Sequence, residues 1–155
     1  MLLLFSFSAL TILGLDFVTK WLVQARFQLS ESLDLVPGVA LTYVMNPGAA
    51  FSLFAGQPSS LRLPLFITVT VLALVAVIFY FRRLPHGDHL SALALGLVSG
   101  GAIGNLVDRL RFGQVVDFIE VGVRGVYTWP VFNVADSAVS VGVALLIWRS
   151  FKPKR

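Results

Sequence analysis

The sequence predicts an all-α membrane protein with four transmembrane helices and a small β-rich element built from the two extracytoplasmic excursions. Of its 155 residues, 57% are hydrophobic and only 13% are charged, whereas soluble domains carry about 25% charged residues. Mean hydropathy is +0.85. The predicted spans are the apolar runs over residues 2–23, 63–81, 90–107 and 134–148. This length allows one integral-membrane domain, residues 1–155.

The first two spans differ in their polar content. Residues 2–23 lack a basic start and a small-residue cleavage site, so we expect a retained span. They contain Asp16 and Lys20, which are four apart and share one helix face. A structural ion pair and a pair that braces a polar site both fit this spacing. Residues 63–81 carry no charge and end at Arg82-Arg83.

The third span predicts close helix packing, because glycine recurs every four residues along it, at Gly96, Gly100 and Gly104. Asn105, Asp108 and Arg109 follow at the far end of the same helix. Asn105 and Arg109 share a face, with Asp108 beside it. By themselves, these three residues fit either a polar helix end in interfacial water or a functional site.

The fourth span begins with a polar sequence of its own. Asn133 is a suitable N-cap, which would put Asp136 in the first helical turn. A basic tail over residues 149–155 follows the span.

The two long excursions predict short strands, with structure that lies on the membrane surface as the alternative for the first of them. Residues 35–45 are rich in Val, Leu, Thr and Tyr, interrupted by Pro37-Gly38, and Asn46-Pro47-Gly48 then predicts a turn. Residues 114–121 alternate loosely, and the glycines of residues 122–125 turn the chain back toward residues 126–129. We therefore expect a short hairpin there.

Basic residues indicate how the chain lies across the membrane. The tail and the loop at Arg82-Arg83 hold six Lys and Arg in two short stretches, and the other six are spread over far more chain. This density favours cytoplasmic termini. Seven of the eight acidic residues then fall at the outer side, with Asp88 as the exception. Polar residues from four segments of the chain converge there, which indicates a polar site at the outer surface.

The residue types present narrow the chemistry of that site. The chain has no cysteine and two histidines, His86 and His89, in one short loop. The absence of cysteine excludes disulfides, Cys-based metal sites and Cys–His nucleophiles. A Ser–His nucleophile is disfavoured, because both histidines lie in that one loop. The net charge of +4 comes from residues at the ends of apolar runs, so we expect anionic membrane lipids rather than nucleic acid as the partner.

Asp117 and Asp136 both lie among apolar residues, where a carboxylate is costly to desolvate. Two carboxylates held close cannot both ionise cheaply, so one keeps its proton. The ionised group can then take a proton from water while the protonated group polarises a carbonyl. Such a pair hydrolyses peptide bonds without a metal or another cofactor.

Two other classes of function fit the acidic residues. A small ion- or proton-coupled carrier would use Asp16, Asp117 and Asp136 as a path. Against it, the acids gather at one surface and no polar stripe crosses the second or fourth span. A metal-dependent membrane hydrolase would use carboxylates to hold Mg²⁺ or Ca²⁺.

Five motifs in this order, between four spans, resemble lipoprotein signal peptidase (signal peptidase II), an aspartyl endopeptidase family of bacterial membranes. They are Asp16-Phe-Val-Thr-Lys20, Asn46-Pro-Gly-Ala-Ala-Phe51, Gly104-Asn-Leu-Val-Asp-Arg109, Val116-Asp-Phe118 and Phe132-Asn-Val-Ala-Asp136. The resemblance covers nearly the whole chain.

The resemblance implies a role for each motif residue. Asp117 and Asp136 would be the catalytic pair. The substrate pocket would be lined by Asn46, Gly48, Asn105, Arg109 and Asn133. Support would come from Asp16, Lys20 and Asp108. No metal or other cofactor is expected.

The resemblance also implies a substrate and a place in the cell. The substrate would be a prolipoprotein whose cysteine carries a diacylglyceryl group, cut just before that cysteine. The protein would be a monomer of the bacterial cytoplasmic (inner) membrane, with both termini cytoplasmic and its active site toward the outer face.

Overall fold

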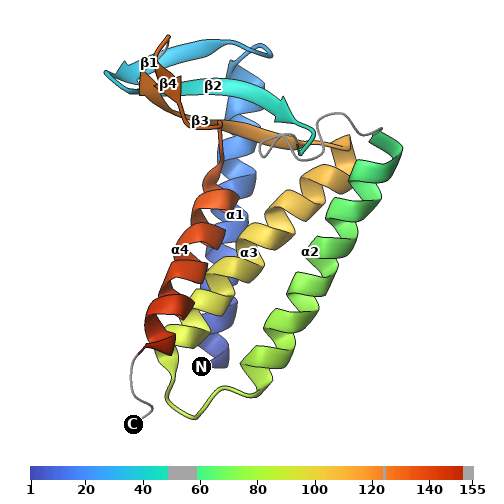
Figure 1. Ribbon diagram of the computed structural model, residues 1–155, viewed down its shortest axis with the longest axis vertical. Coiled ribbons are helices and arrows are strands. Elements are labelled where there is room, and N and C mark those ends of the chain that lie inside the picture. The colour runs from blue at the N-terminus through green and yellow to red at the C-terminus, as the bar shows by residue number, and fades with distance from the viewer. Residues whose placement is uncertain (49–58, 124, 152–155) are drawn as a thin grey trace.

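Four helices run side by side and a small sheet lies across one end of them (Figure 1). The computed structural model describes residues 1–48, 59–123 and 125–151. The helices are α1 (Leu2–Arg26), α2 (Ser59–Arg82), α3 (His89–Phe112) and α4 (Val134–Ser150). α1 begins and α4 ends at the end of the bundle away from the sheet (Figure 1). Residues 49–51 of the second motif and 152–155 of the basic tail lie outside the described residues.

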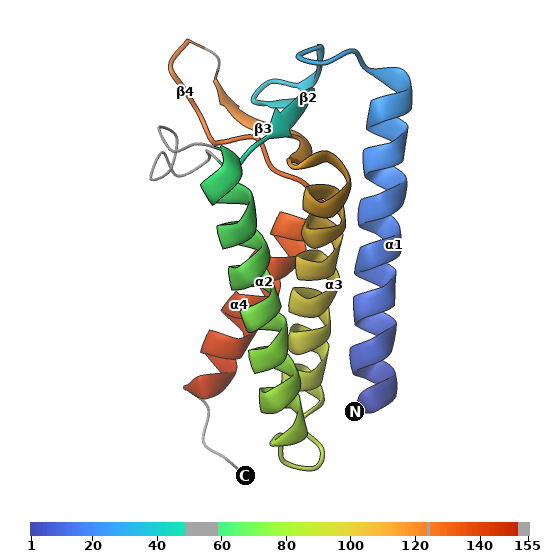
Figure 2. The ribbon, with the colours of Figure 1, turned by 90° about the vertical axis from the view of Figure 1, so that its right-hand side faces the viewer.

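α3 is the central helix, with α1, α2 and α4 packed around it (Figure 2). Its glycines allow the close approach that the sequence predicted. A Cβ added at Gly100 would lie 2.5 Å from the carbonyl oxygen of Ala9 in α1, and one at Gly101 would lie 2.4 Å from that of Ala135 in α4. The predicted stripe of Gly96, Gly100 and Gly104 is therefore confirmed and packs against α1, while Gly101, which was not part of the stripe, allows the same approach to α4.

The outer surface of the bundle is apolar, as expected of helices that face lipid. Leu72 and Phe79 of α2, for example, are 62% and 56% exposed. α1, α2 and α3 are long and apolar enough to cross a membrane. Helices are thus confirmed at the four predicted spans. α4, with 17 residues, is shorter, and its role as a fourth span stays a prediction.

The sheet has four antiparallel strands in the order β1-β2-β3-β4. β1 (Ser32–Val36) and β2 (Val39–Asn46) come from the first excursion, while β3 (Val115–Val123) and β4 (Tyr127–Thr128) come from the second. The hairpin predicted in the second excursion is confirmed, and the strand pairing of the first excursion is a second hairpin. The β2–β3 pairing aligns Val44 with Asp117 and Asn46 with Val115. It therefore brings the first excursion beside the aspartate of the second.

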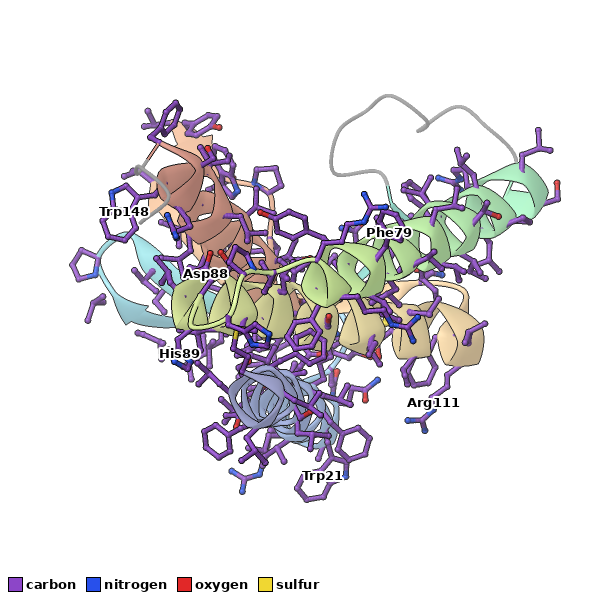
Figure 3. The ribbon with its side chains drawn as sticks, turned by 90° about the horizontal axis from the view of Figure 1, so that it is seen from below. Trp21, Phe79, Asp88, His89, Arg111 and Trp148 are labelled. Atoms are coloured by element: carbon purple, nitrogen blue, oxygen red, sulfur yellow. The ribbon has the colours of Figure 1, made fainter. Side chains whose placement is uncertain are left out.

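At the opposite end of the bundle, Asp88 is the one acidic side chain among the residues that the structure describes. Its side chain accepts a hydrogen bond from the N–H of Ser91 at 3.2 Å and so caps α3. The Nε atom of Arg149, at the end of α4, lies 3.2 Å from both carboxylate oxygens of Asp88. Figure 3 shows this end, with Asp88 and Trp148 labelled. The pair ties the start of α3 to the end of α4.

Candidate active site

Asp117 lies on β3 and is almost fully buried, with 1% of its surface exposed. Two asparagine amides hold it. Asn46 Nδ2 donates to Asp117 Oδ2 at 2.8 Å, and Asn133 Nδ2 donates to Asp117 Oδ1 at 2.7 Å. Burial raises the pKa of the Asp117 carboxyl to about 7; the Asn46 amide opposes the rise and the nearby Asp136 carboxylate adds to it. Asp117 is therefore placed to keep a proton near neutral pH.

Asp136 lies in the first turn of α4, where Asn133 is the N-cap, as the sequence predicted. The Asp136 N–H donates to Asn133 Oδ1 at 2.8 Å, and the Asn133 N–H donates back to Asp136 Oδ2 at 3.3 Å. This reciprocal capping box fixes the carboxylate at the start of the helix. Asn105 Nδ2 donates to the other carboxylate oxygen of Asp136, Oδ1, at 2.7 Å. The helix N-terminus favours negative charge on Asp136.

Asn133 joins the two aspartates. Its side chain is fully buried, and its Nδ2 group is shared among Asp117 Oδ1, Asn105 Oδ1 at 3.1 Å and the carbonyl of Val116 at 3.2 Å. A single residue thus contacts both carboxylates and the asparagine that holds Asp136. The two aspartates, 19 positions apart in the sequence, are brought into one hydrogen-bonded group.

Lys20 lies beneath this group and is 4% exposed. Its Nζ atom is 2.7 Å from Asp16 Oδ2, 2.8 Å from Asp108 Oδ2 and 3.1 Å from Asn105 Oδ1. The ammonium has three donors and meets three acceptors. Asp16 and Lys20 therefore form the predicted ion pair, and through Asn105 that pair also braces the polar site.

The two carboxylates that hold Lys20 also bind backbone. Asp16 Oδ1 accepts from the N–H of Ala135, next to Asp136, at 3.1 Å. Asp108 Oδ2 accepts from the N–H of Val116, next to Asp117, at 3.1 Å. Sequence reasoning did not identify these backbone contacts, because no local pattern marks the N–H group that a distant carboxylate will reach.

Gly48 and Arg109 complete the predicted set. The N–H of Gly48 donates to Asn46 Oδ1 at 2.8 Å, and the φ angle of +89° at Gly48 favours glycine. Arg109 Nη1 donates to the carbonyl of Asn105 at 3.4 Å. All ten predicted site residues thus lie in one contact network at the sheet end of the bundle. Among the described residues, no three His, Asp or Glu side chains are grouped to hold a metal ion.

Comparison with known proteins identifies the family. A family model described as signal peptidase (SPase) II matches residues 8–152. The chain belongs to the signal peptidase II family. It is 45% identical over 147 residues to a lipoprotein signal peptidase of Syntrophus aciditrophicus, covering 94% of this chain and 91% of that protein. The lipoprotein signal peptidase of Geobacter sulfurreducens is 49% identical over 135 residues, covering 86% and 82%.

A solved structure supports the same assignment. The chain matches a bacterial membrane enzyme, determined by the in meso method, with a TM-score of 0.82 and 30% identity, covering 96% of this chain and 92% of the other. The chain is thus a multi-pass membrane peptidase with signal peptidase II function. The relatives give no support to the alternative of an ion- or proton-coupled carrier.

Replacing Lys20 with methionine tests the network beneath the site. Lys20→Met leaves Asp16 and Asp108 buried without their cation, so we expect a loss of about 3–5 kcal/mol in unfolding free energy. Arg26→Gln is the matched control, because Arg26 is an exposed cation on the same helix and should change stability by less than about 0.5 kcal/mol. Unfolding in detergent measures both. Equal stability of the two variants would show that Lys20 does not hold the site together.

Proposed function

We propose that the chain is an aspartyl endopeptidase whose catalytic pair is Asp117 and Asp136. The observation that carries this proposal is the double role of Asn133. Its Nδ2 group binds Asp117 at 2.7 Å, while its Oδ1 atom and backbone N–H bind Asp136 at 2.8 and 3.3 Å. An asparagine that holds one carboxylate on a strand and another at a helix start fixes their relative position before substrate arrives.

The environments of the two carboxylates favour different protonation states. Asp117 is the more deeply buried, and burial raises its pKa to about 7. Asp136 is only partly buried and sits at a helix N-terminus, which stabilises its negative charge. In the free enzyme the shared proton therefore resides mainly on Asp117.

Peptide hydrolysis follows from this arrangement. Asp136 takes a proton from water as the water oxygen bonds to the scissile carbonyl carbon, and Asp117 donates its proton to the carbonyl oxygen. The tetrahedral intermediate then collapses: the C–N bond breaks, the leaving amine takes the proton from Asp136, and Asp117 recovers its own. The water and the two carboxyl groups balance every step, so the reaction needs no metal or other cofactor.

The surrounding residues divide between the substrate and the scaffold. Asn46, Gly48, Asn105, Arg109 and Asn133 line the pocket in this proposal. Arg109 provides a cation for substrate carbonyls, and the asparagines keep the carboxylates in place. Asp16, Lys20 and Asp108 support the pocket from below through the buried ion pairs at 2.7 and 2.8 Å.

The proposed substrate is a prolipoprotein whose cysteine carries a diacylglyceryl group, with cleavage just before that cysteine. The relatives named as lipoprotein signal peptidases support this choice. A lipid-anchored substrate keeps its scissile bond close to the membrane surface, and the site lies where the helices meet the sheet (Figure 1). The exposed apolar helix faces are suited to its acyl chains.

The proposed topology has four spans. The 17 residues of α4 would extend about 25 Å at 1.5 Å per residue, against a hydrocarbon core of about 30 Å. Trp148 and Arg149 at its end suit a membrane interface. Both termini would then be cytoplasmic and the sheet would lie outside the bacterial inner membrane. We further propose that the enzyme works as a monomer of one domain, residues 1–155.

Amide substitutions test the catalytic pair. Asp117→Asn and Asp136→Asn keep the side-chain shape but remove the groups that exchange protons, so turnover should fall by about 10²-fold or more in each. The control is Asp34→Asn, which changes an exposed aspartate of β1 and should keep wild-type turnover. Cleavage of a lipidated precursor by purified protein in detergent is the assay. More than about a tenth of wild-type turnover in either variant would refute the proposal that Asp117 and Asp136 are the catalytic pair.

The pH profile tests the shared proton. Turnover should be bell-shaped, because the active form has one proton on the pair and both its loss and the gain of a second abolish the chemistry. The alkaline limb should lie near pH 7, since burial raises the pKa of Asp117 to about 7. Single-turnover rates, with protein integrity checked at each pH, provide the measurement. A rate that rises to a plateau at high pH would indicate one base acting alone.

Reporter fusions test the orientation. A reporter in the loop at His86-Gly87 should read cytoplasmic, and one beside Ser59 should read external, because α2 separates the two positions. A reporter after Arg155 should read cytoplasmic if α4 crosses the membrane. An external signal after Arg155 together with a cytoplasmic one at His86-Gly87 would show that α4 does not span.

A further inference from the structure

Phe66 of α2 contacts two residues, Gly48 and Arg109, and each of them bonds to an asparagine that holds one carboxylate of the proposed pair. It lies near the sheet end of α2, and the apolar pattern of that helix gave no reason to single it out. Its ring packs against the turn at Gly48 on one side of the site and lies under the guanidinium of Arg109 on the other. These two contacts connect an otherwise apolar helix to the reaction centre.

The first contact leads to Asp117. A Cβ added at Gly48 would lie 2.2 Å from Cε2 and 2.7 Å from Cζ of the Phe66 ring, so the ring edge rests directly on the glycine backbone. The N–H of Gly48 donates to Asn46 Oδ1 at 2.8 Å, and Asn46 Nδ2 donates to Asp117 Oδ2 at 2.8 Å. Phe66 therefore packs against the turn that orients the Asn46 amide.

The second contact leads to Asp136. Arg109 Cζ lies 5.2 Å from the centroid of the Phe66 ring, within the range of a cation–π interaction. Arg109 Nη1 donates to the carbonyl of Asn105, and Asn105 Nδ2 donates to Asp136 Oδ1 at 2.7 Å. The ring face thus restrains a guanidinium that bonds to Asn105, the residue that holds the other carboxylate.

We infer that Phe66 is a positioning residue for the peptidase reaction, which sets the Asn46–Gly48 turn and the Arg109 guanidinium relative to each other. The inference rests on the proposed catalytic pair. Phe66 acts through residues that bond to the asparagines holding the carboxylates, so its loss should slow the chemical step more than it weakens substrate binding. A ring that merely filled space in the bundle would affect stability and leave the turnover of the folded enzyme unchanged.

The chain contains a matched control for this inference. Phe79 lies on the same helix near the other end (Figure 3), and Arg83 Cζ lies 4.0 Å from the centroid of its ring. Phe79→Leu removes the same aromatic side chain from under an arginine, away from the site. Phe66→Leu should lower kcat by about tenfold or more, since small misplacements of reacting groups are costly, with KM changed less than about threefold. Phe79→Leu should leave both constants at wild-type values.

A second set of variants preserves the packing. Phenylalanines with one, two or three ring fluorines at position 66 keep nearly the same shape but weaken the negative face of the ring. We expect kcat to fall in step with fluorination at position 66 and to stay constant at position 79. This fluorination series tests the positioning role of Phe66 even if Phe66→Leu fails to fold.

Each outcome bears on the inference. Normal kcat in Phe66→Leu, no trend with fluorination, or a raised KM at unchanged kcat would each overturn the positioning role. In those cases inactivity of Asp117→Asn would leave the catalytic pair standing. If Asp117→Asn keeps its turnover, the proposed function fails, and the role of Phe66 fails with it.

Discussion

The buried ammonium of Lys20 is the interaction on which the site depends. Its three acceptors are Asp16, Asp108 and Asn105, at 2.7, 2.8 and 3.1 Å. Each acceptor binds a further part of the molecule: Asp16 the start of α4, Asp108 the start of β3, and Asn105 the carboxylate of Asp136. The desolvation cost of a buried charge is offset only when all of its partners are in place. The helices and the sheet are therefore held in one arrangement by a cluster that must form completely.

This arrangement gives two aspartates different surroundings. Asp117 lies inside a sheet between two asparagine amides, whereas Asp136 begins a helix whose N-terminus stabilises negative charge. Asn133 holds both. Because these hydrogen bonds exist before any substrate binds, the reaction proposed for the two aspartates would need little reorganisation. Phe66 extends the same principle to α2 through its contacts with the turn at Gly48 and with Arg109.

Local patterns predicted most of the fold. Apolar runs located the helices, the residues of the second excursion located its hairpin, and the glycine stripe of α3 marked a packing face. The gathering of acids at one end predicted a site, and five motifs named its residues. The contacts of Lys20 with Asp108 and Asn105 and the backbone contacts of Asp16 and Asp108 were not predictable, because they join segments distant in sequence. Phe66 was missed because one phenylalanine in an apolar helix resembles the others.

The central claim is that one proton is held on Asp117 by a network assembled before substrate binds. Infrared difference spectroscopy of the substrate-free enzyme, with isotope-labelled aspartate, tests it most directly by detecting protonated carboxyl groups. At mildly acidic pH we expect a protonated aspartate signal that disappears as pH rises through about 7 and is missing in Asp117→Asn. A spectrum with no protonated aspartate, or one whose signal persists in Asp117→Asn, would contradict it.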